Sequence, residues 1–198
     1  MSDKYSIDSH KLIYHPERVY QWTKAKDDWD KLKKVYPIYV EISPYGGCNH
    51  RCTFCALDYM GYENIGIEFE SLKKTIGEMG ASGVKSVMFA GEGEPMLFKD
   101  LDLICEHASS VGIDTSLTTN FVPATLKNVE RYMKNCSWIK VSLNAGTKEN
   151  YAKIHDTKEK DFDKVIENLK HAVRIRKEQN LKCTLGVQML LLPENKDE

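Results

Sequence analysis

Five short apolar runs, separated by amphipathic segments, constrain the fold of this chain more than any other feature. The runs are rich in β-branched and aromatic residues, which favour strands, and they cover residues 38–42, 84–90, 113–119, 138–143 and 182–192. Between them, apolar residues recur at helical spacing. Strands that alternate with helices predict a parallel sheet with right-handed crossovers. We therefore expect an α/β fold, and a barrel or partial barrel rather than a flat doubly wound sheet.

The predicted helices have recognisable boundaries. Gly83 supplies a stop signal before the second strand, and Gly112 ends the helix before the third. Pro123 stands where the next helix is expected to open, because proline suits the first helical position. A short helix is expected near residues 148–154, and residues 162–173 carry the best amphipathic stripe of the chain. The βα unit is thus repeated along the chain.

Composition indicates an enzyme core that works inside the cell. The chain has 198 residues and a net charge of −1, from 28 basic and 29 acidic residues, so neither nucleic acid nor a membrane is expected as a partner. Its first residues lack a secretory signal pattern, and no apolar run approaches the roughly 20 residues of a membrane span. We expect a cytoplasmic protein. Residues 1–36, with two possible short helices, are expected to form an N-terminal extension beside a main domain of residues 37–198.

Three cysteines directly after the first predicted strand form the strongest chemical motif. Cys48, Cys52 and Cys55 are spaced C-x3-C-x2-C, so their sulfurs can surround one metal centre from a single loop. A [4Fe–4S] cluster has four irons, and cluster proteins normally offer four thiolates. A site with three cysteines leaves one iron open, and an open coordination position is typical of a reacting metal centre.

Polar residues follow the other predicted strands at their ends. In parallel α/β barrels, reactive residues gather on the loops that leave the carboxyl ends of the strands. Here the second strand runs into Glu92, Gly93 and Glu94, and the third ends in Thr118, Thr119 and Asn120; Ser142 and Asn144 follow the fourth. A structural protein has no reason to place small polar groups at each exit. The pattern predicts a site for a polar ligand.

These motifs resemble those of the radical S-adenosylmethionine (radical SAM) superfamily. The cysteine loop, with Phe54 before its last cysteine, looks like the signature loop of that superfamily. Residues 91–95 resemble its Gly-Gly-Glu-Pro motif, with Glu92 where the first glycine is usual. Residues 118–120 and 141–144 resemble its third- and fourth-strand motifs, where an aspartate is commoner than Asn144. Residues 192–195 are similar to a fifth-strand ending in the branch of molybdopterin-precursor synthases and peptide-maturing enzymes.

The resemblance implies a fold, two cofactors and a reaction. The fold would be a partial (β/α)6 TIM-like barrel, here truncated after the fifth strand. A [4Fe–4S] cluster would bind S-adenosylmethionine at its open iron and cleave it reductively, giving a 5′-deoxyadenosyl radical that abstracts hydrogen from a substrate. The implied metal ligands are Cys48, Cys52 and Cys55. The implied cofactor-binding residues are Phe54, Glu92, Gly93, Glu94, Thr119, Asn120, Ser142 and Asn144.

Within that set, the resemblance implies separate roles. Glu94 would hold the methionine ammonium, since an acid meets a cation there. Thr119 and Ser142 suit the carboxylate, Asn144 the ribose hydroxyls, and Phe54 would lie near the adenine. The substrate, which we expect to be a peptide, a sugar or a small metabolite, stays open. A reductant such as flavodoxin or ferredoxin is the other expected partner.

The main alternative is a non-catalytic iron–sulfur or zinc protein that uses the same loop for electron transfer or structure. Zinc would need a fourth ligand, which His50 or a distant cysteine could supply. The remaining cysteines, Cys105, Cys136 and Cys183, are interpreted as buried apolar filler. The pair His155–Asp156 could act in catalysis, but we interpret it as a solvated helix end.

The last six residues look like the beginning of a helix. Asn195 is a capping candidate, and acidic residues follow it, which suits the positive end of a helix. Together with the count of five strands, this pattern suggests that the sequence is a fragment of a longer protein.

Overall fold

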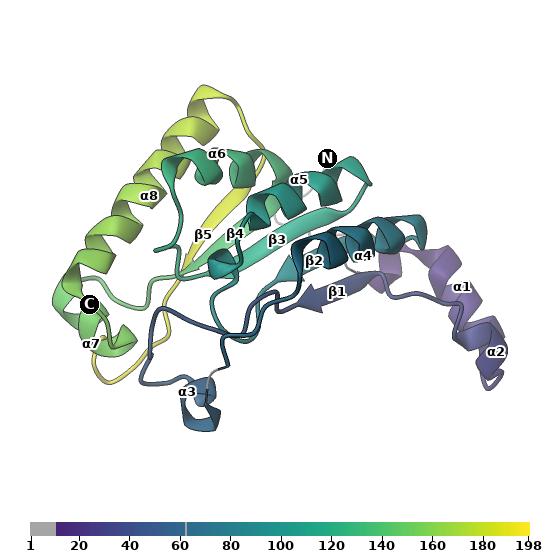
Figure 1. Cartoon of the computed structure of the whole chain (residues 1–198), viewed down its shortest axis with the longest axis horizontal. Helices are drawn as coiled ribbons and strands as arrows, with labels where there is room; N and C mark the ends of the chain where they lie inside the picture. Colours follow the sequence, from purple (N-terminus) through teal and green to yellow (C-terminus); the bar gives the residue numbers. More distant parts are fainter. Residues whose placement is uncertain (1–10, 62) are drawn as a thin grey trace.

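The computed structural model describes residues 11–61 and 63–198, apart from the side chain of Asp58. Its centre is one parallel sheet of five strands in the order β1-β2-β3-β4-β5 (Figure 1). The strands are β1 (Tyr39–Ile42), β2 (Ser86–Phe89), β3 (Asp114–Thr119), β4 (Cys136–Ser142) and β5 (Thr184–Gln188). All five predicted strands are confirmed. The fifth is shorter than expected, since residues 189–192 lie beyond its pairing with β4, which ends at Ser142 opposite Gln188.

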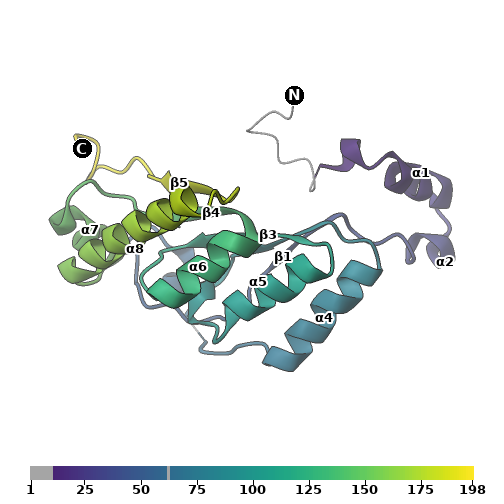
Figure 2. The same cartoon turned by 90° about the horizontal axis from the view of Figure 1, so that it is seen from above.

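The main helices lie on one face of the sheet. They are α4 (Phe69–Ala81), α5 (Leu101–Ser110), α6 (Leu126–Asn135) and α8 (Glu159–Glu178), and Figure 2 shows them side by side as a single layer. Each successive strand is added on the same side of the last one, so right-handed crossovers put every helix on the same face. This winding is that of a partial barrel, whereas a doubly wound sheet carries helices on both faces.

Side-chain alternation separates the two faces of the sheet. Val87, Phe89 and Leu117 point into the helix layer and are fully buried. Met88, between Val87 and Phe89, and Thr118, next to Leu117, point to the opposite face and are only partly buried. The Thr118 hydroxyl lies 3.8 Å from the Met88 sulfur on the neighbouring strand. Because side chains alternate along a strand, the sheet presents an apolar face to the helices and a more polar face to the barrel interior.

The start of α6 differs from the prediction. Pro123 lies in the loop before the helix, which begins at Leu126. Thr125 caps it: the Thr125 hydroxyl accepts from the backbone N–H of Asn128, and the Asn128 side chain accepts from the N–H of Thr125. This reciprocal capping box satisfies two helix-end donors at once, and proline at position 123 offers no such bond. The boundary is therefore set by the cap.

The remaining helices stand at the two ends of the sheet. At the carboxyl ends of the strands lie α3 (Ala56–Met60), the 3-10 turn η3 (Pro95–Leu97) and α7 (Lys148–His155); near the start of the chain lie η2 (Leu12–Tyr14), α1 (Pro16–Ala25) and α2 (Trp29–Leu32). Figure 2 shows α1 and α2 to one side of the helix layer. Arg18 of α1 donates to the carbonyls of Tyr36, Ser82 and Gly83. Among the helices described, none is long and apolar enough to span a membrane.

The end of the chain does not form the expected helix. Residues 193–197 form turns. The Asn195 side chain, 1% exposed, accepts from the N–H of Leu192 and donates to the carbonyls of Asn144 and Leu190. The hydrogen bonds of Asn195 therefore hold a compact turn beside the exit of β4, and Asn195 caps no helix.

Candidate metal centre

The cysteine loop leaves the carboxyl end of β1 and rests on the loop that leaves β2. The N–H of Glu94 donates to the carbonyl of Gly47 at 2.8 Å. Gly93 makes this approach possible: its φ is +71°, and a Cβ there would lie 2.4 Å from the Gly47 oxygen and 2.5 Å from that of Tyr45. Only glycine tolerates both the left-handed conformation and the contact. The Gly91–Pro95 segment is thus shaped to support the cysteine loop.

A second support comes from the end of α7. The N–H groups of Arg51 and Thr53 donate to the carbonyls of His155 and Ile154 at 3.0 and 2.9 Å. The last carbonyls of a helix have no partner within the helix. Here the cysteine loop satisfies two of them. The loop therefore spans from the exit of β2 to the segment that follows β4.

The exit of β3 supplies a third support. The side-chain amide of Asn120 donates to the Asn49 oxygen at 2.8 Å, and its own oxygen accepts from the N–H of Val122 at 3.0 Å. Asn120 is buried, whereas Asn49, between the first two cysteines, is exposed. The predicted site residue Asn120 is therefore tied directly to the cysteine loop.

The three cysteines are partly buried free thiols. Burial raises the pKa of Cys48, and it raises the pKa of Cys52 to about 12. The N–H of His50 lies 3.4 Å from the Cys48 sulfur, and Cys55 occupies the position before the first turn of α3. Thiols with raised pKa values stay protonated at neutral pH until a cation replaces the proton. A metal that binds Cys48 or Cys52 must therefore displace a proton from the thiol.

Glu94 joins the exits of β2 and β3. Its carboxylate is buried and accepts from the Thr119 hydroxyl, from the N–H of Asn120 at 2.7 Å and from the N–H of Met96 at 3.0 Å. Burial raises the pKa of Glu94 to about 7, although these hydrogen bonds lower it. Of the predicted cofactor-binding residues, Glu94, Thr119 and Asn120 form one connected group.

The other predicted residues lie around this group. Ser142 is half-buried at the end of β4, and Phe54, 40% exposed, meets the His155 ring edge-on with 6.3 Å between ring centroids. Asn144 is buried with φ +56°, and its side-chain oxygen accepts from the N–H of Leu190. Glu92 is exposed and lines a cavity of about 510 Å³ beside the cysteine loop. The structure therefore gives Asn144 a role in holding the segment after β5.

His155 is not a solvated helix end, as the sequence suggested. It is 1% exposed, with Nδ1 3.1 Å from the Cys52 sulfur and Nε2 3.0 Å from the carbonyl oxygen of Leu143. A carbonyl only accepts, so Nε2 carries the proton and Nδ1 faces the thiol with its lone pair. The spacing of Tyr151 and His155, one turn apart on α7, is the sequence signal that places both on the buried face.

His50 is buried to the same extent as His155. The sequence indicated only that it could be a fourth zinc ligand. Its ring lies 5.1 Å from that of His155 and 5.9 Å from that of Tyr151, and its Nε2 is 3.5 Å from an Asp161 oxygen. Burial lowers the pKa values of both histidines, and the pKa of His50 falls to about 4. Both imidazoles are therefore neutral at neutral pH, which is the form that binds metals.

The remaining three cysteines behave as predicted. Cys105, Cys136 and Cys183 are buried free thiols. Cys105 and Cys136 belong to the apolar core between the sheet and its helices, as does Cys183. Burial raises the pKa of Cys105 and of Cys183, so these thiols stay uncharged and serve as packing.

A partial α/β barrel with a C-x3-C-x2-C loop at its first strand exit defines a class of iron–sulfur enzyme cores. The family model of the Radical SAM superfamily matches residues 42–198, so the chain belongs to this superfamily. The matched range includes the cysteine loop and every strand exit described above. Membership implies a [4Fe–4S] cluster and S-adenosylmethionine as cofactors.

Curated relatives are enzymes of different kinds. The chain is 26% identical over 166 residues to a dTDP-4-amino-4,6-dideoxy-D-glucose ammonia-lyase of Streptomyces venezuelae, covering 81% of this chain and 34% of that enzyme. It is 30% identical over 148 residues to a GTP 3′,8-cyclase of Campylobacter jejuni subsp. doylei, covering 69% of this chain and 43% of that enzyme. The chain thus spans less than half the length of these relatives.

Solved structures share the fold. Streptococcus suis SuiB bound to its precursor peptide SuiA matches with a TM-score of 0.64 and 21% identity, over 93% of this chain and 40% of SuiB. SuiB bound to S-adenosylmethionine matches with a TM-score of 0.61 and 18% identity, over 88% of this chain and 44% of SuiB. These structures confirm the predicted fold class, and the family model confirms the predicted superfamily.

The donor set of the cysteine loop fits a cluster better than a single zinc ion. Three thiolates on one zinc would lie roughly 3.8 Å apart, given tetrahedral geometry and bonds of about 2.3 Å. Among the described residues, the group of three potential ligand atoms that lie within 4.8 Å of one another is His50, Cys52 and His155, without Cys48 or Cys55. In a cluster each cysteine binds a different iron, so the three sulfurs stand further apart.

Proposed function

We propose that this chain is the core of a radical SAM enzyme in which Cys48, Cys52 and Cys55 hold a [4Fe–4S] cluster. When bound, the cluster and S-adenosylmethionine supply a 5′-deoxyadenosyl radical for hydrogen abstraction; this chemistry belongs to the cofactors. The protein binds and orients them and excludes water. In this proposal residues 37–198 form the core and residues 1–36 an extension beside it.

One observation carries the proposal: the cysteine loop is tied to two further strand exits and to the segment after a third. Gly47 accepts from Glu94 at the exit of β2, and Asn49 accepts from Asn120 at the exit of β3. Arg51 donates to His155 at the end of α7, which follows β4. These polar ties come from three different parts of the barrel edge. They fix the thiols at the carboxyl edge of the sheet, where barrel enzymes bind substrates.

Glu94 is our candidate for the ammonium of S-adenosylmethionine. It is a buried carboxylate whose pKa of about 7 leaves it partly protonated at neutral pH. A cation placed beside a carboxyl group favours the ionised form and lowers its pKa. The bound ammonium would therefore complete the ionisation of Glu94. Gly93 and Glu92 contribute through the shape of the same loop.

The other contacts are assigned by position. Thr119 and Ser142 stand at neighbouring strand ends. The Thr119 hydroxyl already donates its one hydrogen to Glu94, so the proposed contact with the carboxylate of S-adenosylmethionine falls to Ser142, and Thr119 would hold Glu94 in place. Phe54 would contact the adenine. Since the Asn144 oxygen is already bound to Leu190, the proposed ribose contact falls to its side-chain NH2. Asn120 would position the site through Asn49.

The substrate and the electron donor are proposed by class only. The relatives act, by name, on a dTDP-amino sugar and on GTP, and one solved neighbour is bound to a precursor peptide. A sugar, a peptide or another small metabolite therefore agrees with the family. A flavodoxin or ferredoxin would supply the electron.

The test is anaerobic reconstitution of the full chain with iron and sulfide, followed by reduction in the presence of S-adenosylmethionine. The expected product is 5′-deoxyadenosine, and Cys52→Ala should remove both the cluster absorbance and the product. Cys183→Ala is the matched control, because it removes a buried thiol outside the loop. A zinc-free chain that forms no cluster under these conditions, or forms one but yields no 5′-deoxyadenosine, would instead be the non-catalytic alternative.

A further inference from the structure

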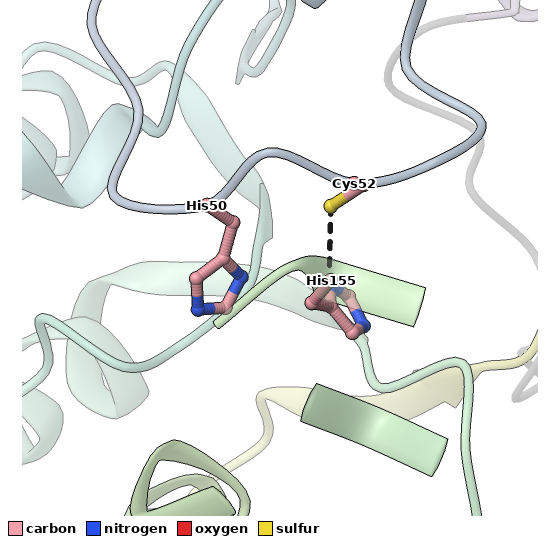
Figure 3. Close-up of side chains that lie close together, drawn as sticks. All are labelled: His50, Cys52 and His155. Carbon is pink, nitrogen blue, oxygen red and sulfur yellow. Dashed lines mark hydrogen bonds between the residues drawn. The ribbon is translucent and has the colours of Figure 1, made fainter. Parts of the chain in front are cut away.

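A compact group of three potential metal ligands lies beside the cysteine loop. One ligand atom each from His50, Cys52 and His155 lies within 4.8 Å of the other two (Figure 3). Two belong to the loop and the third to the end of α7, so the group joins segments about a hundred residues apart. The shortest pair is the Cys52 sulfur and His155 Nδ1, at 3.1 Å. Only one member, Cys52, is among the three cluster cysteines.

Both histidines are oriented as metal ligands usually are. A ligating histidine places one nitrogen at the metal and the other beside a carbonyl or carboxylate oxygen. His155 has Nδ1 toward Cys52 and Nε2 3.0 Å from the carbonyl oxygen of Leu143. His50 has Nε2 3.5 Å from an Asp161 oxygen, and Figure 3 shows its other ring nitrogen on the side of Cys52 and His155. The two rings thus present one nitrogen each to the same space.

His50 carries an unexplained polar group. Its side chain is 1% exposed. Its Nδ1 has no hydrogen-bond partner among the described residues, and its Nε2 has only the Asp161 oxygen at 3.5 Å, which is long for a hydrogen bond. Buried polar atoms are normally satisfied. Nδ1 of His50 faces the Cys52 thiol and the His155 ring (Figure 3). A cation bound between these three groups would give Nδ1 of His50 the partner that it lacks.

We propose that His50, Cys52 and His155 form a mononuclear zinc site that competes with the cluster for Cys52. One thiolate and two imidazoles suit Zn²⁺, with water as the fourth ligand. Tetrahedral bonds of about 2.0–2.3 Å need ligand atoms roughly 3.5 Å apart, which small side-chain rotations provide. Zinc displaces the thiol proton of Cys52 to solvent, and no electron is transferred. Because Cys52 cannot bind both metals, a zinc-loaded chain excludes the cluster.

The first test is a Co²⁺ titration of the cluster-free full chain. The thiolate-to-cobalt absorption band is expected to saturate at one Co²⁺ and to disappear when Zn²⁺ is added. His50→Phe and His155→Phe keep a ring against Tyr151 but remove a ligand, and each should weaken Co²⁺ binding at least tenfold. Cys48→Ser and Cys55→Ser are the matched controls and should bind Co²⁺ as the wild type does. Loss of binding in either serine variant, with none in the histidine variants, would move the metal to the cysteine triad and overturn the proposal.

The second test needs no variant. X-ray absorption at the zinc edge of the loaded wild-type chain should show one sulfur among nitrogen or oxygen neighbours. Three sulfur neighbours, or failure of the wild type to bind Co²⁺ or Zn²⁺ at all, would contradict the site. The inference depends on the Cys52 thiol and not on radical chemistry. If the zinc-free chain supplied with iron and sulfide gives no 5′-deoxyadenosine, while the zinc-loaded chain shows one sulfur neighbour, the proposed function is refuted and this site still stands.

Discussion

The side-chain amide of Asn120 donates to the side-chain oxygen of Asn49 at 2.8 Å and joins the exit of β3 to the middle of the cysteine loop. The two residues are 71 positions apart in the sequence, and Asn49 stands between Cys48 and Cys52. It is a direct polar link between the loop and a neighbouring strand exit.

Asn49→Ala should therefore loosen the loop without unfolding the protein. It leaves a buried donor of Asn120 without its protein acceptor, which costs about 1 kcal/mol in unfolding free energy. The reconstituted cluster should then be lost to a chelator several times faster than from the wild type. Denaturant unfolding and the decay of cluster absorbance measure the two effects. Ser110→Ala, which removes an exposed hydrogen bond to His107, is the control; equal cluster lifetimes in both variants would contradict the tether.

Gly93→Ala should be far more damaging than an alanine at another glycine with positive φ. At Gly93 a Cβ would lie 2.4 Å from the Gly47 oxygen, whereas at Gly112, with φ +78°, a Cβ meets nothing within 4 Å. Both variants suffer the left-handed strain of about 1 kcal/mol. Only G93A also pushes the cysteine loop away. We expect G112A to bind the cluster normally and G93A to bind little, as measured by iron content; similar iron content in the two would show that the close approach is unimportant.

The sequence predicted what depends on local pattern. Alternating apolar runs indicated all five strands, and the cysteine spacing with the strand-exit residues indicated the superfamily. The start of α6 was wrong because Thr125 and Asn128 form a capping box, and a cap outweighs the weak preference of proline for a first turn.

Long-range contacts explain the other errors. His155 is the last residue of α7, and its polar neighbours in the sequence make it resemble a solvated helix end. Its burial arises because the cysteine loop, about a hundred residues earlier, folds over the end of α7 and takes its carbonyls. In the same way Asn195 looked like a helix cap, but it binds the carbonyl of Asn144. The spacing of Tyr151 and His155 places His155 on the buried face of α7, but no periodic pattern shows which distant segment covers it, or that Asn195 meets Asn144.

Glu94 should make stability depend on pH. Burial raises its native pKa from 4.5 to about 7, so between these values the folded chain binds a proton that the unfolded chain has released. Its contribution is complete below about pH 4.5 and is lost as pH rises through 7, by up to roughly 3 kcal/mol. The buried histidines, with lowered pKa values, act in the opposite sense. The measurement is therefore the difference in unfolding free energy between wild type and Glu94→Gln from pH 5 to 8, which should decline with pH; a flat difference would mean that Glu94 is ionised throughout.

Asn195→Ala should release the segment after β5. The Asn195 side chain makes hydrogen bonds of 2.7 Å with the N–H of Leu192 and the carbonyl of Asn144, and one of 2.6 Å with the carbonyl of Leu190. Its loss leaves the buried carbonyl of Asn144 and two partly buried backbone groups without this partner, so we expect about 2 kcal/mol of destabilisation and faster hydrogen exchange at residues 189–195. Asn150→Ala, which removes only an exposed bond to Glu198, should have little effect on either quantity. Because Asn144 is bound to the same segment, N195A should also weaken S-adenosylmethionine binding if the proposed ribose contact is right. Unchanged exchange in N195A would show that the segment is held by its apolar contacts alone.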